Sequence, residues 1–398
     1  MPGPTSDCRA TERKHPWPMV RLGELGTMVR GNGIRRCETV ESGCPCLRYG
    51  EIYTSFNVIL DKPRSFVPKE LFDRSVKIKK GDLVFTLTGE NTEEIAKALA
   101  YLGEGEIAAG GDLAVWTGHG CDSKYLAYLM YSPQLISQKA ATGNGNIVVH
   151  TSIKKLQQLE IPLPPLPVQR EIVARLEREL AAVEKMKKGF EALAETAKQE
   201  FKAELKEVFE DSRYALEPLS KYCSFTGGSQ PPKSSFIYEP KDGYVRLYQI
   251  RDYNGDPKPT YIKASDAKKM SRRGDIMIGR YGASIGLVFW AEDGAYNVAM
   301  VKVLINSSTI LPEFVFEALH TPRIQSVFHS ASRNAQAGFN ESEWNKMELP
   351  VPPLPVQREV VVRLDLVKAR AEKLEAKARE GVAVCETMRK AILKEAFE

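Results

Sequence analysis

The sequence has no apolar run of about 18 residues, the length that a membrane-spanning helix needs, and this excludes a transmembrane helix. Residues 1–18 carry charges and prolines without an apolar centre, so a secretory signal is not expected there. Without a signal, the seven cysteines are expected to be reduced thiols in the cytoplasm.

The chain also lacks a strong excess of charge of one sign. Its 56 Lys and Arg residues face 51 Asp and Glu residues, which leaves a net charge of +5 over 398 residues. The excess is spread evenly along the chain, so it does not by itself indicate a nucleic-acid partner. A binding face would require basic side chains to gather in space. The length predicts two or three domains with real cores.

Catalytic motifs are missing as well. The sequence has no phosphate-binding loop of the form G-x-x-x-x-G-K-[ST] and no Asn/Asp-Pro-Pro-aromatic motif of an amino-methyltransferase. Cys44 and Cys46 are too close together for a zinc clip, and no second clip follows. The histidines are scattered and indicate no triad: His15, His119, His150, His320 and His329. We therefore expect no catalytic residue and no metal site in this chain.

What the chain does contain is a repeat. Residues 162–176 read PLPPLPVQREIVARL and residues 350–364 read PVPPLPVQREVVVRL, with twelve of fifteen positions identical at an offset of 188. The similarity continues more weakly upstream, where three short stretches match: Gly81-Asp82 with Gly274-Asp275, Arg48–Ile52 with Arg246–Ile250, and Asp112–Val115 with Asn297–Met300. Each half is thus expected to be a globular head, a proline motif and a helix.

The segment after each proline motif predicts a long helix. Pro167 and Pro355 suit a first helical turn, and no proline follows either of them in its helix. Apolar residues recur at heptad spacing in the first copy at Ile172, Leu176, Leu180, Val183, Met186, Phe190, Leu193, Ala197, Phe201, Leu205 and Val208. The second copy has Val360, Leu364, Val367, Ala371, Leu374, Ala378, Gly381, Cys385, Met388 and Ile392. This pattern predicts that the two helices pair as a coiled coil.

The heads are expected to be mixed α and β. Short strand-like runs are Leu83–Leu87, Leu113–Trp116, Tyr244–Ile250, Asp275–Gly279, Leu287–Trp290 and Ala299–Ile305. Amphipathic helices are expected at Tyr125–Ala141 and Pro312–Ser330. The fold class is therefore α+β, with two related heads joined by two long antiparallel coiled-coil helices and a pseudo-twofold internal repeat.

Polar loops occur at matching places in the two heads. DNA is recognised by Arg and Lys at phosphates and by Arg, Asn, Gln, Ser and Thr at base edges. Residues of these types are candidates for DNA contact in the first head at Arg30, Asn32, Arg35, Arg36, Thr88, Asn91, Asn144 and Asn146. The second head offers Ser229, Gln230, Lys233, Arg280, Tyr281, Arg333 and Gln336. Any one of them is typical of an ordinary solvated surface, but the recurrence in two heads favours binding, and the differing sets favour two different targets.

The doubled L/V-P-P-L-P-V-Q-R-E-[IV]-V motif between variable heads resembles the specificity (S) subunit of type I restriction-modification systems. The resemblance divides the chain into residues 1–16 as a flexible tail, 17–161 as the first target recognition domain, 162–213 as the proline motif and first spacer helix, 214–349 as the second target recognition domain, and 350–398 as the second motif and helix.

The resemblance implies a non-catalytic subunit that recognises double-stranded DNA. Each head would read one half of a bipartite site, and the helix pair would set the spacer. Two methyltransferase (M) subunits, which hold S-adenosylmethionine, would dock on the repeated regions, for which Gln169, Arg170, Gln357 and Arg358 are candidates. Motor-nuclease (R) subunits would add ATP and Mg. No cofactor would be bound by this chain itself.

Two other functions stay open at this point. The chain could be a DNA-modifying enzyme with a cryptic site, which would bind S-adenosylmethionine or a metal on its own. It could also be a coiled-coil scaffold whose heads bind proteins, in which case salt-sensitive DNA binding would be absent. A system without an R subunit has the same sequence features as a complete one.

Overall fold

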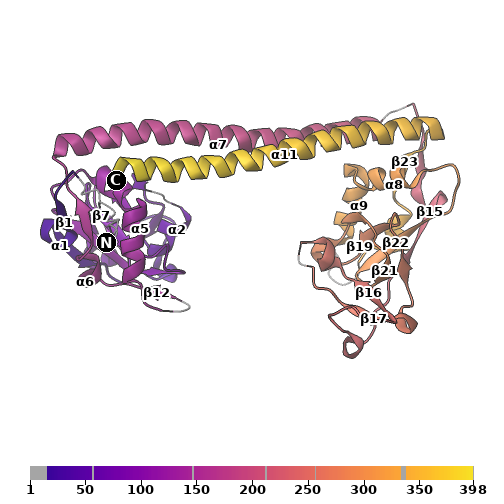
Figure 1. Cartoon of the computed structure of the whole chain (residues 1–398), viewed down its shortest axis with the longest axis horizontal. Helices are drawn as coiled ribbons and strands as arrows, with labels where there is room; N and C mark the ends of the chain where they lie inside the picture. Colours follow the sequence, from indigo (N-terminus) through magenta and orange to yellow (C-terminus); the bar gives the residue numbers. More distant parts are fainter. Residues whose placement is uncertain are drawn as a thin grey trace, which may run out of the picture. The chain divides into compact units, whose positions relative to one another are not determined.

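The computed structural model describes residues 16–55, 58–145, 148–210, 213–255, 257–332 and 338–397. The chain divides into two compact units (Figure 1). The first unit holds residues 1–189 and 380–398, and the second holds residues 190–379. Each unit therefore contains one head and one half of each long helix, so the division falls within the helices.

The first head is built on two sheets that pack face to face. The five-stranded sheet has the order β2 (Thr27–Arg30), β11 (Leu113–Thr117), β7 (Leu83–Thr86), β9 (Ala98–Tyr101), β4 (Ile59–Leu60). The four-stranded sheet has the order β5 (Ser65–Val67), β3 (Cys44–Leu47), β10 (Ile107–Ala109), β6 (Lys77–Ile78). Two small ladders pair β1 (Met19–Arg21) with β13 (Glu160–Pro162) and β8 (Thr88–Gly89) with β12 (Val149–His150).

Both faces of the three central strands of this sheet, β11, β7 and β9, are buried, which explains why these strands are apolar runs without alternation. Leu83 and Phe85 belong to the core shared with the helices, and Val84 belongs to the core shared with the other sheet. The helices of this head are α1 (Leu22–Leu25), α2 (Tyr49–Thr54), α3 (Lys69–Arg74), α4 (Ser123–Leu129), α5 (Pro133–Thr142) and α6 (Ile153–Leu156), with one 3-10 turn, η1 (Arg36–Glu38).

The second head repeats this plan. One sheet has the order β15 (Cys223–Gly227), β22 (Met300–Ile305), β19 (Ile276–Gly279), β20 (Val288–Trp290), and the other has the order β17 (Tyr261–Lys263), β16 (Tyr244–Tyr248), β21 (Gly294–Tyr296), β18 (Met270–Ser271). A small ladder joins β14 (Leu216–Pro218) to β23 (Glu348–Pro350). The helices are α8 (Pro312–Leu319), α9 (Pro322–Ser332) and α10 (Glu341–Trp344). The 3-10 turns are η2 (Leu219–Lys221), η3 (Lys233–Ser235), η4 (Ile250–Tyr253), η5 (Ala264–Asp266) and η6 (Gly282–Ser284).

Strand order and direction agree between the heads. In the sheet β5-β3-β10-β6 and in the sheet β17-β16-β21-β18, the two central strands are parallel, and each outer strand is antiparallel to its neighbour. In the described part of the second head, no strand corresponds to β4. The predicted repeat of mixed α/β heads is confirmed, and all six predicted strand runs contain strands.

The detailed register of the repeat differs from the predicted one at two places. Arg48 and Gln249 both follow the parallel strand and precede a helical turn, so Arg48 corresponds to Gln249 and not to Arg246. Asp112 corresponds to Ala299, because their carbonyls accept equivalent hydrogen bonds from Leu87 and Arg280. The predicted match of Gly81-Asp82 with Gly274-Asp275 holds, since each aspartate caps the turn before it.

The two long helices are α7 (Leu166–Phe209) and α11 (Leu354–Phe397), each 44 residues long (Figure 1). Each begins one residue before the predicted proline. In the first unit, Leu176 near the start of α7 shares a core with Leu393 near the end of α11. In the second unit, Leu205 near the end of α7 shares a core with Leu364 near the start of α11. The helices therefore pack antiparallel, as predicted.

The heptad pattern is partly confirmed by burial. Leu364, Ala371, Ala378 and Cys385, which lie seven residues apart, are all buried. Met186, Leu193 and Met388, which were predicted to lie in the seam, are exposed by 38–42%. An ion pair flanks the seam in each unit: Lys187 Nζ lies 2.5 Å from Glu386 Oε1 in the first, and Arg363 contacts Glu204 and Glu207 in the second.

Each predicted amphipathic helix of the heads is in fact two helices. The first is split between α4 and α5 where Ser132 caps a new helix that starts at Pro133. The second is split between α8 and α9 at Pro322. In both cases a proline removes a backbone donor and begins a new helix, which apolar periodicity alone does not reveal.

Candidate nucleic-acid interface

One end of the five-stranded sheet in the first head, and the same end of the β15-β22-β19-β20 sheet in the second, collects most of the predicted DNA-contacting residues; we call it the loop end. In the first head it consists of the last residues of β2 and β7 and the first residue of β11. The antiparallel registers pair Arg30 with Ala114 and Thr86 with Leu113. In the second head the same end joins β15, β19 and β22, with Gly227 opposite Val301 and Gly279 opposite Met300.

Three loops leave the loop end of the first head and lie against one another at their bases. The loop after β2 begins at Gly31, whose N–H donates to Leu113 O at 2.9 Å. The loop after β7 begins at Leu87, whose N–H donates to Asp112 O at 2.8 Å. The third loop, after α5, returns at Thr151, whose N–H donates to Leu87 O at 3.0 Å.

The second head assembles the same three loops. Gly228 N–H donates to Met300 O at 3.1 Å, and Arg280 N–H donates to Ala299 O at 2.9 Å. The third loop returns at Gly338, where a Cβ atom would lie 2.0 Å from Arg280 O. Sequence candidates from separate loops are therefore brought to one end of each sheet by the strand order.

Close backbone approach requires glycine at the start of the first loop in both heads. A Cβ at Gly31 would lie 2.1 Å from Gly110 O, and a Cβ at Gly228 would lie 2.0 Å from Asn297 O. No side chain fits at such distances. The shared glycine holds the loop after β2 or β15 against the connection between the two sheets.

Beside Gly31 lies an arginine-rich cavity of about 430 Å³ in the first head. Arg30, Arg35, Arg48, Tyr49 and Asp112 line it together with glycines of the two approaching loops. The Arg30 guanidinium is held in place there, since Nε donates to Gly111 O at 2.9 Å and Nη2 donates to Asp112 Oδ1 at 3.2 Å. The cavity thus offers several guanidinium groups and one carboxylate at the loop end, a set suited to base edges and phosphates.

Three predicted DNA-contacting asparagines use polar atoms within the chain. Asn32 Oδ1 accepts from Val76 N–H at 2.6 Å. Asn91 Oδ1 accepts from Glu94 N–H at 2.8 Å, and its Nδ2 donates to Glu94 Oε2 at 3.2 Å. Asn144 exchanges two backbone hydrogen bonds with His150. These residues shape the loops, and Asn91 in particular has both ends of its amide engaged.

The other predicted residues fall into three groups. Arg35, Arg36, Gln230, Lys233 and Tyr281 have exposed side chains, and Ser229 and Arg280 are half-buried. Thr88 lies at the base of its loop, where Oγ1 is 3.1 Å from His150 Nδ1. Asn146, Arg333 and Gln336 lie outside the described residues. The first helical residue of η1 is Arg36 and that of η3 is Lys233, so these two cations occupy matching positions.

Tyr53 braces the second loop of the first head. Its hydroxyl lies 2.9 Å from Thr86 Oγ1 and 3.1 Å from both Thr88 O and Glu94 O, so the two carbonyl oxygens share its single proton. Burial raises the pKa of this hydroxyl, so it remains a proton donor over the neutral range. Tyr53 was not predicted from the sequence, because a single tyrosine in a short helix carries no motif.

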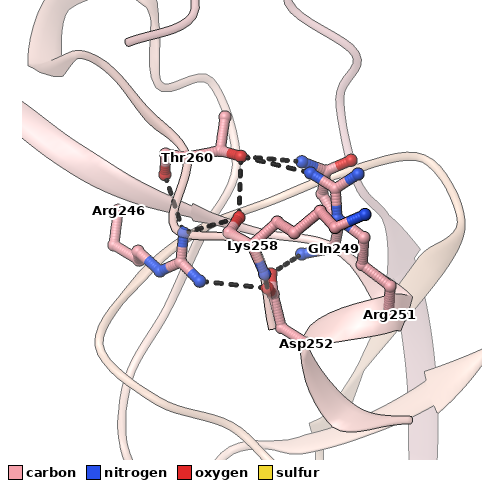
Figure 2. A network of polar contacts seen from close by, with 6 residues as sticks. All are labelled: Arg246, Gln249, Arg251, Asp252, Lys258 and Thr260. Atoms are coloured by element: carbon pink, nitrogen blue, oxygen red, sulfur yellow. Dashed lines mark hydrogen bonds and ion pairs between the residues drawn. The ribbon is translucent and has the colours of Figure 1, made fainter. Parts of the chain in front are cut away.

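Sequence reasoning also missed a polar network after β16 in the second head, which Figure 2 shows. Arg246 Nη2 lies 3.0 Å from Asp252 Oδ1, and the two side chains are only 16% and 4% exposed. The Arg246 guanidinium also lies over the rings of Tyr248 and Tyr261. A buried ion pair of this kind persists only when its remaining polar atoms are satisfied. Here Arg246 Nη1 donates to Thr260 O, and Asp252 accepts from two backbone N–H groups.

The centre of the network is the fully buried Thr260. Its Oγ1 accepts from Gln249 Nε2 at 3.2 Å and from Arg251 Nη2 at 3.3 Å, and donates to Lys258 O at 3.0 Å (Figure 2). In the first head Ser65 takes the place of Thr260, and it donates to Glu51 Oε1 at 2.8 Å. The pattern that could have revealed this network is a helical turn preceded by Arg48 or Gln249 and carrying an acid three residues later.

The predicted docking glutamines have internal partners instead. Gln169 is 3% exposed and Gln357 is fully buried. Gln169 Nε2 donates to Pro164 O, and its Oε1 accepts from Asp122 N–H. Gln357 Nε2 donates to Pro352 O and Thr309 O, and its Oε1 accepts from Leu311 N–H. This corrects the prediction that the two glutamines meet a partner: they attach the proline motif to the start of α4 in the first head and of α8 in the second.

The neighbouring arginines differ from the glutamines. Arg170 and Arg358 are exposed, one residue after each buried glutamine. Docking through these two side chains stays a prediction. The repeated motif thus divides into a buried residue that holds the head and an exposed residue beside it.

Known proteins share features of this sequence and architecture. A family model, the type I restriction modification DNA specificity domain, matches residues 14–189. The EcoKI specificity subunit of Escherichia coli is 21% identical to this chain, over 96% of this chain and 88% of its own length. The EcoBI specificity subunit of Escherichia coli is 25% identical over 69% of this chain and 66% of its own length.

Residues 14–189 thus match the DNA specificity domain of type I restriction-modification systems, and the chain along nearly its whole length is similar to specificity subunits of such systems. A solved structure concerned with complex assembly and conformational transition of the type I restriction-modification system has the same fold. It matches with a TM-score of 0.77 at 20% identity, over 97% of this chain and 99% of its own. The fold that this chain shares with it therefore includes both heads and both long helices.

No described helix combines the length and the apolarity that crossing a bilayer requires. No group of three or more His, Cys, Asp or Glu side chains within the described ranges is placed to hold a metal ion.

Proposed function

We propose that this chain is the DNA-recognition subunit of a type I restriction-modification complex and acts on DNA in the cytoplasm. Each head reads one half of a bipartite site through its loop end. The observation that carries this proposal is that two heads of equal topology present different polar side chains at the same end of the same sheet. Equal backbone with unequal side chains is what two readers of different half-sites require.

The partners follow from the division of labour in such a complex. Two methyltransferase (M) subunits dock on the repeated regions, with Arg170 and Arg358 exposed at equivalent positions. They hold S-adenosylmethionine and modify adenine, and motor-nuclease (R) subunits use ATP and Mg. This chain supplies recognition and takes no part in the chemistry.

The test is methylation-site sequencing of DNA from cells that express the chain with the M subunit encoded beside it. The expected result is one gapped motif with N6-methyladenine in both halves. If the complex assembles and no gapped motif is modified, the proposal is overturned, and binding of protein partners by the heads becomes the better explanation.

The spacer function of the helices has its own test. Seven residues, one heptad, are inserted both after Lys187 and after Arg379, so that the antiparallel seam keeps its pattern. Each insertion adds about 10 Å of helix at about 1.5 Å per residue, and the preferred spacer should lengthen by about three base pairs. As a control, the heptad inserted in one helix alone breaks the pairing and should lower modification at every spacer length. An unchanged spacer in the double insertion would count against a ruler function.

A further inference from the structure

In each head one arginine lies at the end of a strand of the loop end, but the strand differs: Arg30 ends β2 in the first head, and Arg280 directly follows β19 in the second. Position 30 of β2 corresponds to position 227 of β15, because Arg30 pairs with Ala114 and Gly227 pairs with Val301, the second residues of their ladders. Position 87 corresponds to position 280, because both donate a backbone hydrogen bond to the residue before the neighbouring strand. The first head therefore has Arg and Leu at these positions, and the second head has Gly and Arg.

Arg30 and Arg280 fill equivalent space, each in its own head. In the second head, a Cβ built at Gly227 would lie 3.3 Å from Arg280 Nη1. The Arg280 guanidinium therefore lies where the side chain of a residue at position 227 would begin. In the first head, Leu87 is 4% exposed and belongs to the apolar core, so it leaves this space to Arg30. Each head thus has an arginine at one of these two positions, but on a different strand.

Both guanidinium groups are oriented by the protein. Arg30 is held along its Nε and Nη2 edge by Gly111 O and Asp112 Oδ1, while the side chain is 63% exposed. The Nη1 and Nη2 edge is the one that remains for a ligand. Arg280 lies over the Tyr281 ring at 5.2 Å, and its buried Nε has no hydrogen-bond partner within the residues that the structure describes. A planar fork held on one side is preorganised for bidentate recognition on the other.

The ligand chemistry is decided by the carboxylate beside Arg30. Asp112 lies 3.2 Å from Arg30 Nη2 and is 44% exposed. A phosphate bound to this guanidinium would be repelled by that carboxylate, whereas a neutral base edge would not. The base that accepts two parallel hydrogen bonds from arginine is guanine, through O6 and N7 in the major groove.

We propose that Arg30 in the first head and Arg280 in the second are corresponding specificity-determining residues, each donating two hydrogen bonds to one guanine of its half-site. The inference rests on the proposed function, since it names the base that each loop end recognises. It gives the two heads a common reading position that is supplied from different strands.

The test uses the assembled complex with its M subunit and methylation-site sequencing of the wild type, Arg30→Ala and Arg280→Ala. Arg30→Ala should relax one G·C pair in the first half-site only, and Arg280→Ala should relax one G·C pair in the second only. The preference for G at that pair should fall by about 5- to 150-fold, the range for losing one bidentate contact. Arg21→Ala is the matched control, because Arg21 lies on β1 and pairs with Glu160, and it should change neither half-site.

A second variant tests the shared space without removing a charge. Gly227→Ala places a methyl group against Arg280 Nη1, so the guanidinium must shift by a few tenths of an ångström. It should weaken the same base preference as Arg280→Ala, to a smaller degree. Thermal melting and complex assembly of each variant identify any that fail to fold, and for such a variant the lysine substitution, which keeps the charge and loses the fork, replaces the alanine.

The outcomes separate the inference from the function beneath it. If the wild type yields a gapped motif and both arginine variants keep it unchanged, the inference is wrong and the proposed function stands. If binding weakens equally at all sequences and the salt slope falls by about one, the arginines contact phosphates, and base reading is refuted. If the assembled wild type modifies no gapped motif, the proposed function itself fails.

Discussion

The two heads of this chain differ much more in the side chains at their loop ends than in the residues that hold their folds. Gly31 and Gly228 make the same backbone contact, and Gln169 and Gln357 make the same attachment to the proline motif. At the loop ends, by contrast, the residue of the second head that corresponds to Arg30 is Gly227. A duplicated chain can thus keep its backbone and change its ligand, because the loop side chains contribute little to the core.

The heads also differ inside. Six residues after the proline that begins α5 lies Lys139, and six residues after the proline that begins α9 lies Phe328. Both positions are buried. Phe328 packs in an aromatic group with Phe339, whereas Lys139 has Ala96 O as a hydrogen-bond acceptor. The first head therefore buries a titratable group where the second buries a ring.

If the two heads read independently, exchange of a whole head should have the largest effect on the recognised DNA sequence. Replacing residues 20–160 by the corresponding segment of another specificity subunit should replace one half-site completely and leave the other as it was, because each head has its own core and its own loop end. Methylation-site sequencing measures both halves at once. A change in both half-sites would show that the heads do not read independently.

Substitution of the shared glycines, Gly31 and Gly228, should destabilise the protein by nearly equal amounts. Gly31→Ala and Gly228→Ala each put a Cβ about 2 Å from a backbone carbonyl, and each should lower the free energy of unfolding by about 3 kcal/mol. Denaturant unfolding of the full chain provides the measurement. Gly33→Ala is the matched control, since a Cβ there meets nothing within 4 Å. A loss in one head but not in the other would break the equivalence.

The two glutamines allow a finer comparison. Gln357→Leu removes three hydrogen bonds to buried backbone groups and Gln169→Leu removes two. Unfolding free energy should fall by about 2–3 kcal/mol for the first and somewhat less for the second, because unsatisfied buried groups cost about 1–3 kcal/mol each and the sites relax in part. Arg170→Leu and Arg358→Leu, at the exposed neighbouring positions, should change the stability little. An equal loss of unfolding free energy in all four variants would contradict the inference that the buried glutamines, and not the exposed arginines, hold the proline motif in place.

The smallest predicted effect concerns pH. Burial, aided by repulsion from Lys97, lowers the pKa of Lys139 to about 7. In the unfolded chain the ordinary lysine pKa near 10.5 keeps the proton, so the unfolded state binds more protons between about pH 7 and pH 10.5. The stability contributed at this site should therefore rise with pH through that window, by about 2 kcal/mol from pH 7 to pH 9.

The variant Lys139→Met isolates this contribution. The difference in unfolding free energy between Lys139→Met and the wild type should be large and in favour of Met at pH 7, and should shrink towards pH 9. Phe328→Leu in the second head is the control. Because phenylalanine does not titrate, the loss of unfolding free energy in this variant should not depend on pH. A difference that is constant with pH would show that Lys139 is charged in both states.

Much of the fold could be predicted because local pattern and tertiary structure agree there. The repeat from Pro162 and Pro350 identified the long helices, and apolar runs identified the strands. The register of the repeat at Arg48 was misjudged, because the residues that match in letters, Arg48 and Arg246, do not match in strand position. Met186 and Met388 were placed in the seam by periodicity, but both lie exposed.

The candidate site was predicted in part. The loops that contain Arg30, Ser229 and Arg280 were found from composition, because these polar runs interrupt the strands. Hydrogen bonding within the chain could not be foreseen from composition. Through such hydrogen bonds Asn91 stabilises its loop, and Gln357 attaches the proline motif to the second head. The network around Thr260 is also formed by such bonds, and no sequence motif indicates it.

The sequence by itself determined the duplicated architecture, since twelve identical residues in fifteen and a heptad pattern are properties of the letters alone. Only the tertiary structure decided which side chains share one end of a sheet. Strand order brings positions 30 and 87 to the same end of a sheet on either side of β11, and positions 227 and 280 to the same end on either side of β22, although more than fifty residues of chain separate each pair. The reason is physical: antiparallel pairing joins strand ends according to backbone hydrogen bonds, and a linear pattern does not record which ends meet.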